Sequence, residues 1–230
     1  MAVYDEWEAA NARVAALSPD VLTDCELLVL QYRREVVARS LPAVDHQIIN
    51  RLAAEADPKA LGGKNLADVL STRLRISKSE AARRIKQAEL LGSRQATTGE
   101  PLPPKLPTAA AAQKQGEIGF EHLRIIEKFF DDLPDRIDYE TREAAEAHLA
   151  EMACELGPTQ FRAAADRLAL LLNQDGDLPD DADRARRRYL TIEKQDVDGT
   201  SRVHGRLDPE GRATLDAVLA KWAAPGCVTR

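Results

Sequence analysis

Apolar residues recur every three or four positions along most of this chain, and this spacing is what most restricts its possible folds. The longest series lies close to a seven-residue repeat: Leu27, Leu30, Val37, Leu41, Val44, Ile48 and Leu52. Residues with that spacing share one face of a helix, and a helix of that length usually packs against an antiparallel partner. The sequence therefore predicts a mainly α protein, a multi-helix assembly with one long N-terminal helical segment.

Local signals mark the ends of several helices. Thr23 with Glu26 is a capping box, in which a hydroxyl and a carboxylate satisfy free amides of the first helical turn. Ser77 with Glu80 repeats this pattern before a later helix. Pro42 removes a backbone donor, so we expect a kink or a split within the long segment.

The pattern changes near residue 189. Leu190 and Ile192 alternate with polar residues, and Asp198-Gly199 favours a hairpin turn. We therefore expect a single C-terminal β-hairpin at about 189–207, followed by a helix that begins near Pro209.

We expect the chain to be organised in three stretches. Residues 1–94 hold the N-terminal helices, including a helix-turn-helix-like pair at 64–92. Residues 95–115 lack helical periodicity and carry four prolines, which predicts a Pro-rich linker or loop. Residues 116–230 hold further helices, an acidic loop, the hairpin and the last helix.

Composition is that of a soluble protein, with 44% hydrophobic and 30% charged residues and a net charge of −6. The apolar runs are shorter than the roughly 18 to 20 residues of a membrane span, and the acidic N-terminus shows no secretory signal. Cys25, Cys154 and Cys227 are odd in number and far apart, which fits a reducing compartment. We therefore expect a cytoplasmic protein with no membrane partner.

The segment 64–94 carries eight cationic and three acidic side chains within an otherwise acidic chain. Two short helices joined by a tight turn, the second with a basic outer face, are typical of a helix-turn-helix. Arg83 and Gln87 would point outward to base edges of duplex DNA, and Lys86 to phosphates. The candidate DNA-binding residues are Arg73, Arg75, Lys78, Arg83, Arg84, Lys86 and Gln87. The alternative interpretation is the solvated face of a helical hairpin.

A secondary basic cluster directly precedes the hairpin and consists of Arg184, Arg186, Arg187 and Arg188. Three aspartates, Asp180, Asp181 and Asp183, come just before it. Local pairing between these opposite charges is the favoured interpretation, with a second nucleic-acid contact as the alternative.

Residues suited to catalysis or metal binding form no recognisable pattern. The four histidines and three cysteines show neither a His-Glu-x-x-His nor a Cys-x-x-Cys spacing. His148, Glu151 and Glu155 share one helical face, but a second helix lacks a matching set, so a solvated surface is the better interpretation. We expect no catalytic residue, no metal site and no cofactor.

Three stretches carry a family resemblance: 77–91 (SKSEAARRIKQAELL), 116–126 (GEIGFEHLRII) and 186–211. In this order they resemble the actinobacterial domain of unknown function 222, as it occurs in the mycobacterial thirteen-E-twelve repeat family. The resemblance covers about residues 20–222, as one family domain. Members are commonly followed by an HNH nuclease module, so the resemblance implies a helical region that helps a nuclease engage DNA.

An HNH nuclease needs a metal-binding histidine and a second histidine as general base, and no histidine follows His204. We therefore expect a shortened, non-catalytic, DNA-associated helical module that does not cut DNA. Two alternatives stay open. In the first alternative, the chain is a structural or protein-interaction module whose apolar stripe from Leu27 to Leu52 pairs across a homodimer. In the second, it is a degenerate remnant that does not bind DNA.

Overall fold

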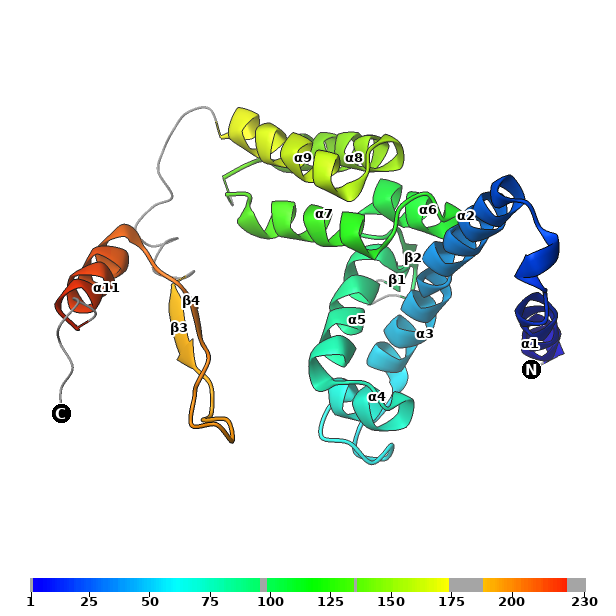
Figure 1. The fold of residues 1–230 in the computed structure, drawn as a ribbon, viewed down its shortest axis with the longest axis horizontal. Helices are drawn as coiled ribbons and strands as arrows, with labels where there is room; N and C mark the ends of the chain where they lie inside the picture. The colour runs from blue at the N-terminus through cyan, green and yellow to red at the C-terminus, as the bar shows by residue number, and fades with distance from the viewer. Residues whose placement is uncertain (1, 96–98, 135, 174–187, 223–230) are drawn as a thin grey trace. The chain divides into compact units, whose positions relative to one another are not determined.

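A computed structural model of the chain describes residues 2–95, 99–134, 136–173 and 188–222 (Figure 1). The chain divides into two compact units, at residues 1–172 and 173–230, and each is described by itself. The first unit contains α1 (Ala2–Ala15), η1 (Pro19–Val21), α2 (Asp24–Ser40), α3 (Pro42–Glu55), α4 (Leu66–Leu74), α5 (Lys78–Leu91), β1 (Arg94–Gln95), β2 (Pro101–Leu102), α6 (Pro107–Gln115), α7 (Phe120–Asp132), α8 (Tyr139–Glu155) and α9 (Pro158–Leu172). The second contains β3 (Tyr189–Ile192), β4 (Val203–Arg206) and α11 (Pro209–Trp222). The expectation of a mainly helical fold is confirmed.

The larger core of the first unit lies where α6, α7, α8 and α9 meet, and Figure 1 shows α8 and α9 beside each other next to α7. Its largest fully buried side chains are Phe161, Ile118, Leu123, Ile126 and Leu149. A smaller core joins α3, α4 and α5 through Ile49, Leu70, Ala81 and Ala88. Burial of such apolar area is the main term that stabilises these helices.

The long N-terminal segment is divided into two helices at Pro42, as the sequence predicts. Helix α2 begins after the Thr23–Glu26 capping box and ends at Ser40, and α3 begins at Pro42. Leu41 between them keeps helical dihedrals (φ −54°, ψ −42°), and its amide donates to the Val37 carbonyl. The two helices therefore form one nearly continuous helix that is interrupted, but not redirected into a loop, at Pro42.

Among the described residues of segment 95–115, where a linker or loop was expected, Gln95 belongs to a short β1–β2 pair with Pro101–Leu102, and Pro107–Gln115 form helix α6. Pro107 stands in the first turn of α6, where its missing amide costs nothing. The buried Glu146 of α8 accepts from the Ala109 amide at 2.7 Å, and its negative charge suits a helix N-terminus. This cap comes from a residue 37 positions away, so the local sequence gives no sign of it.

The second unit contains the predicted hairpin and helix. Strand β3 pairs antiparallel with β4, with Tyr189 opposite Arg206 and Ile192 opposite Val203. Gly199 supplies the left-handed residue of the connection, at φ 80°. Asp208 then accepts from the Gly211 amide at 2.7 Å as α11 begins.

The contact between α6 and α2 depends on the absence of a side chain at Gly116. This glycine ends α6 at φ 78°, and a β-carbon there would collide with the carbonyl oxygen of Val36. Gly62 has a similar φ of 86° but has open space around the position of a β-carbon.

We therefore expect Gly116→Ala to lower the free energy of unfolding by about 2 kcal/mol or more, through the left-handed conformation and the collision together. Gly62→Ala is the matched control. It should lower the free energy of unfolding by only about 1 kcal/mol, because it has the left-handed conformation without the collision. Urea unfolding of both variants measures the difference. An equal loss of unfolding free energy in the two variants would mean that α6 does not approach α2 this closely.

Candidate functional site

Helices α4 and α5 lie within segment 64–92, for which a helix-turn-helix-like pair is predicted, and they pack against each other. Asn65 caps α4 by accepting from the Asp68 amide, and Ser77 caps α5 by accepting from the Glu80 amide. Arg75 ends α4 with φ 56°, a left-handed conformation that costs a non-glycine residue about 1–2 kcal/mol. Both helices therefore have local ends that the sequence encodes, joined by a tight and strained turn.

The cations in the middle of α5 lie against a carboxylate of their own helix. Arg83 donates to both oxygens of Glu80, at 2.5 and 2.6 Å, and Arg84 donates to one of them at 2.8 Å. Mainly because of the hydrogen bonds from Arg83, the pKa of the Glu80 carboxyl falls from 4.5 to about 2. The carboxylate thus stays ionised and holds both guanidinium groups in fixed positions.

The predicted outward face of α5 is contacted by α7. Gln87 is only 3% exposed, so the expectation that it points to solvent is wrong. Its amide nitrogen donates to Glu127 at 2.8 Å, and its oxygen accepts from Arg83 at 2.6 Å. Arg83 also lies 4.4 Å from the ring centre of Phe120. The helical wheel of α5 could not reveal this cover, since Phe120 and Glu127 belong to a helix more than 30 residues further along.

Lys86 is ion-paired as well, at 2.6 Å from Asp131 of α7. Both side chains are about half exposed, so this pair is weak and screened by salt. It differs in this respect from the half-buried network of Glu80, Arg83 and Arg84.

Three of the predicted DNA-binding residues remain exposed around the α4–α5 turn: Arg73, Arg75 and Lys78. Lys64 directly precedes the cap residue Asn65 of α4 and is exposed, and its amide donates to the Asp68 carboxylate that Lys78 also contacts. Lys78 pairs with Asp68 at 2.6 Å while its side chain stays 77% exposed, and Arg73 approaches the Leu61 carbonyl at 3.5 Å. We call Lys64, Arg73, Arg75 and Lys78 the basic turn.

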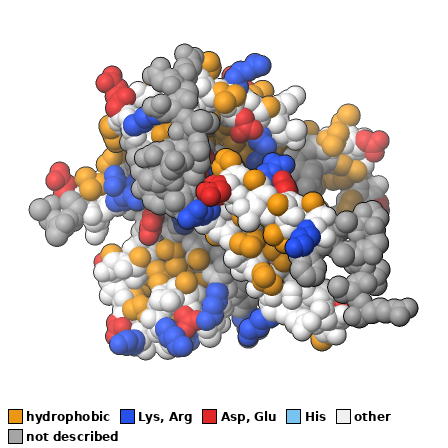
Figure 2. Space-filling model, turned by 90° about the vertical axis from the view of Figure 1, so that its left-hand side faces the viewer, with side chains coloured by type: hydrophobic (Ala, Val, Ile, Leu, Met, Phe, Trp, Pro, Cys, Tyr) orange, Lys and Arg blue, Asp and Glu red, His pale blue; other side chains and the backbone are white. Residues whose placement is uncertain are grey.

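The secondary basic cluster is largely outside the described residues, because Arg184, Arg186 and Arg187 are not among them. Arg188 pairs with Asp208 at 3.1 Å within the second unit. Among the described side chains visible in Figure 2, Lys and Arg lie scattered between acidic and hydrophobic ones.

The N-terminal stripe has an exposed and a buried side. Val37, Leu41, Val44 and Ile48 follow at intervals of four, three and four residues and are 41–52% exposed. On a helical wheel they share one face, and the buried His46 lies opposite. We call these four residues the α2–α3 seam, and they do not belong to the core of the first unit.

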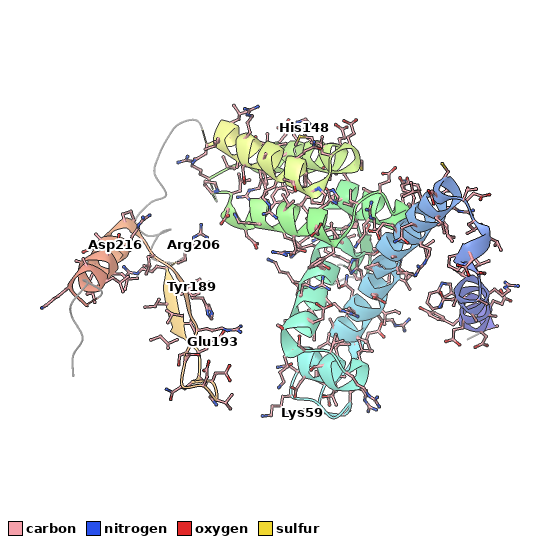
Figure 3. The ribbon with its side chains drawn as sticks, in the orientation of Figure 1. Lys59, His148, Tyr189, Glu193, Arg206 and Asp216 are labelled. Atoms are coloured by element: carbon pink, nitrogen blue, oxygen red, sulfur yellow. The ribbon has the colours of Figure 1, made fainter. Side chains whose placement is uncertain are left out.

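The side chains of the described residues do not assemble three or more His, Cys, Asp or Glu around a point where a metal ion would bind. His148 is exposed on α8, where Figure 3 labels it. Within the same part of the chain, no helix is both long and apolar enough to cross a bilayer.

The Glu80 network makes a prediction about acid stability. The folded pKa lies below the unfolded one, so the stabilisation is present above pH 4.5 and disappears as the pH falls toward 2. We expect Glu80→Gln to lower the free energy of unfolding by about 1–2 kcal/mol at pH 7. Between pH 4.5 and pH 2, the stability of this variant should change less than that of the unmodified chain. Denaturant unfolding at several pH values tests this. Glu55→Gln, in an exposed pair with Arg51, should change stability little, and similar losses in both variants would contradict the assignment.

Comparison with known proteins places the chain in a family. The profile of the family described as "Domain of unknown function (DUF222)" matches residues 29–230. An uncharacterized protein of Mycobacterium tuberculosis is 47% identical over 226 residues, which cover 98% of this chain and 49% of that protein. An uncharacterized protein of Mycobacterium bovis is 48% identical over 225 residues, again 98% of this chain and 49% of the relative.

The chain thus spans about half the length of the curated relatives that it matches. No solved structure matches it significantly. The family profile covers most of the chain, and the relatives agree with the resemblance carried by residues 77–91, 116–126 and 186–211. This chain therefore belongs to the family of the domain of unknown function 222.

Proposed function

We propose that the chain is a helical association module without a catalytic step of its own, and that it pairs with a second copy of itself along the α2–α3 seam. The observation that carries this proposal is the exposed heptad-like spacing of Val37, Leu41, Val44 and Ile48 on one nearly continuous helix. Such spacing suits a helical partner, because apolar side chains at these positions insert between those of a facing helix.

The seam suits a second copy for two reasons. A two-fold axis brings the same face of two copies together, so one apolar stripe is complementary to itself. In addition, the seam spans residues 37–48, about 18 Å of helix at 1.5 Å per residue, which is a little under two heptads of contact. No residue of α1 or α2 is buried within the first unit, so these helices offer further apolar surface to a partner.

Val37→Glu combined with Val44→Glu tests the seam, because a carboxylate there would have to leave water on association. We expect a dimer about 100-fold weaker, because the two copies together lose the burial of four half-exposed valines, at about 0.75 kcal/mol each. Both side chains are about half exposed in the single chain, so the variant should stay folded. Sedimentation velocity over a range of concentrations gives the dissociation constant.

The matched control is Leu170→Glu with Leu171→Glu, two exposed leucines of α9 outside the seam, which should dimerise like the unmodified chain. A chain that sediments as a monomer at the highest concentration would refute the proposal. Equal weakening by both double variants would assign the association to general hydrophobicity.

A second candidate function is contact with duplex DNA through the basic turn, the part of the predicted DNA-binding set that stays exposed. Support comes from Arg75, a strained and exposed cation at the turn, and from Lys78 in the first turn of α5. An ion pair as exposed as Lys78 with Asp68 contributes little, so a DNA phosphate can replace the carboxylate at small cost. The nuclease association that the family resemblance implies points in the same direction.

Arg73→Ala with Arg75→Ala tests this contact. We expect weaker binding to duplex DNA in a gel-shift titration, and a slope of log K against log salt that is smaller in magnitude by about 2, because two phosphate contacts are lost. Arg162→Ala with Arg167→Ala, exposed arginines of α9, removes the same charge elsewhere and should leave the slope unchanged.

Equal behaviour of the two arginine variants would contradict a DNA contact at the basic turn. A larger loss of DNA affinity in Lys86→Ala than in the Arg73→Ala, Arg75→Ala variant would instead assign the contact to the middle of α5. A chain that neither dimerises nor binds DNA would favour the degenerate remnant.

A further inference from the structure

Helix α1 carries an apolar stripe that the described residues of the first unit leave largely exposed. None of its residues is buried, and in Figure 1 it lies apart from the helices of both cores. The stripe consists of Val3, Trp7, Ala10 and Val14, at intervals of four, three and four residues. The α2–α3 seam has the same intervals, so the chain contains two exposed apolar helix faces of equal period.

A groove between α1 and α2 indicates where α1 lies along the longer helix. Its wall comes from the end of α1 and the first half of α2: Asn11, Val14, Leu17, Leu27, Leu30 and Arg34. The chain turns back between the two helices, which places Val14 at about the level of Leu30. At the same rise per residue in both helices, the start of α1 laid along α2 reaches about the level of Leu41. Within one copy, α1 therefore cannot cover Val44 and Ile48.

The small area of the seam is a second observation. A fully buried aliphatic side chain loses roughly 100 Å² of accessible surface, so the half-exposed seam side chains of two copies would bury roughly 400 Å². A stable interface buries at least about 1,200 Å², a little over half of it apolar, and the seam alone falls short of this. The exposed parts of four α1 side chains add roughly 300 Å² per copy, those of Val3, Tyr4, Trp7 and Val14. With α1 included, the apolar area is in the range of a stable dimer.

An antiparallel partner would bring its α1 to the half of the seam that one copy cannot cover. The seam has the same intervals in both directions, so a two-fold axis between Leu41 and Val44 sets Val37 opposite Ile48. The α1 helix of the second copy then lies at the level of about residues 43–56 of the first copy, which form α3.

The charges of the chain favour this antiparallel orientation over a parallel one. Helix α1 carries three carboxylates and one cation, whereas the basic turn beyond α3 carries four cations. Parallel copies would bring two acidic α1 helices together at one end and two basic turns together at the other, and like charges in contact oppose association. Antiparallel copies keep both pairs apart. They also bring Glu8 of one copy within about one helical turn of Arg51 of the other, whose side chain is 78% exposed.

We propose that α1 is an arm that packs against α3 of a second, antiparallel copy and covers the half of the seam around Val44 and Ile48. This inference rests on the proposed association along the α2–α3 seam and adds a second contact to it. Each copy then contributes three helices to one interface: α1, α2 and α3.

Val3→Glu combined with Trp7→Glu tests the arm by sedimentation velocity of the full chain. Both side chains are exposed in the single copy, so the variant should fold like the unmodified chain. We expect the dissociation constant of the dimer to rise about tenfold or more, because carboxylates replace apolar side chains at the contact. The matched control is Tyr139→Glu with Leu170→Glu, exposed on α8 and α9, which should leave the dissociation constant unchanged.

The same measurement separates the arm from the seam. A dimer that Val37→Glu with Val44→Glu weakens, but that the α1 variant leaves unchanged or makes tighter, would overturn the arm and keep the seam. An unmodified chain that stays monomeric would overturn both.

Chemical cross-linking tests which copy α1 contacts. In a chain whose three cysteines are replaced by serine, Glu8→Cys with Arg51→Cys should give covalent dimers with a short bifunctional maleimide. Either substitution alone should not, since each residue lies far from its own equivalent across the two-fold axis. Covalent dimers from Glu8→Cys with Arg33→Cys in place of this pair would indicate parallel copies and overturn the proposal, as would cross-links confined to single chains.

Discussion

Helix α5 packs against α3 on one side and against α7 on the other. This packing determines which of its side chains reach the surface of the first unit. On the side of α3, the amide of Asn50 donates to the carbonyls of Ala88 and Ser93, at 2.8 and 3.0 Å. On the side of α7, Gln87 donates to Glu127. With both sides covered, α5 presents its cations to neighbours in the protein more than to solvent. Only the turn before it and the edge that carries Lys78 and Lys86 stay accessible.

Features that depend on neighbours in sequence could be predicted, whereas features that depend on packing could not. The cap at Thr23, the interruption at Pro42 and the Asp198-Gly199 turn involve atoms within four residues of each other, so the sequence alone determines them. Helix α6 was missed although Pro107 in its first turn and Gly116 at its end are local signals, because the four prolines of the segment were interpreted together as a loop, and its cap from the distant Glu146 leaves no local sign. The outward direction of Gln87 was wrong for a related reason: a helical wheel shows which side chains share a face, but not which later helix covers it.

The network around Glu80 has a structural as well as an electrostatic consequence. Two guanidinium groups on one carboxylate leave a net charge of +1 instead of +2, so the middle of α5 presents a weaker positive field than its two arginines alone would give. Arg83 and Arg84 of this network also line an open pocket between α5 and the helices around it.

The two proposed surfaces have a quantitative link. Four cations in the basic turn neutralise at most about four phosphates, a number that gives weak, strongly salt-dependent binding. A dimer along the α2–α3 seam would present two basic turns and double that number without any new residue. Association and DNA contact would then depend on each other, since binding of two linked turns raises the effective concentration of the second once the first is bound. The four cations of one basic turn would therefore bind DNA weakly, and two linked basic turns would bind it more tightly.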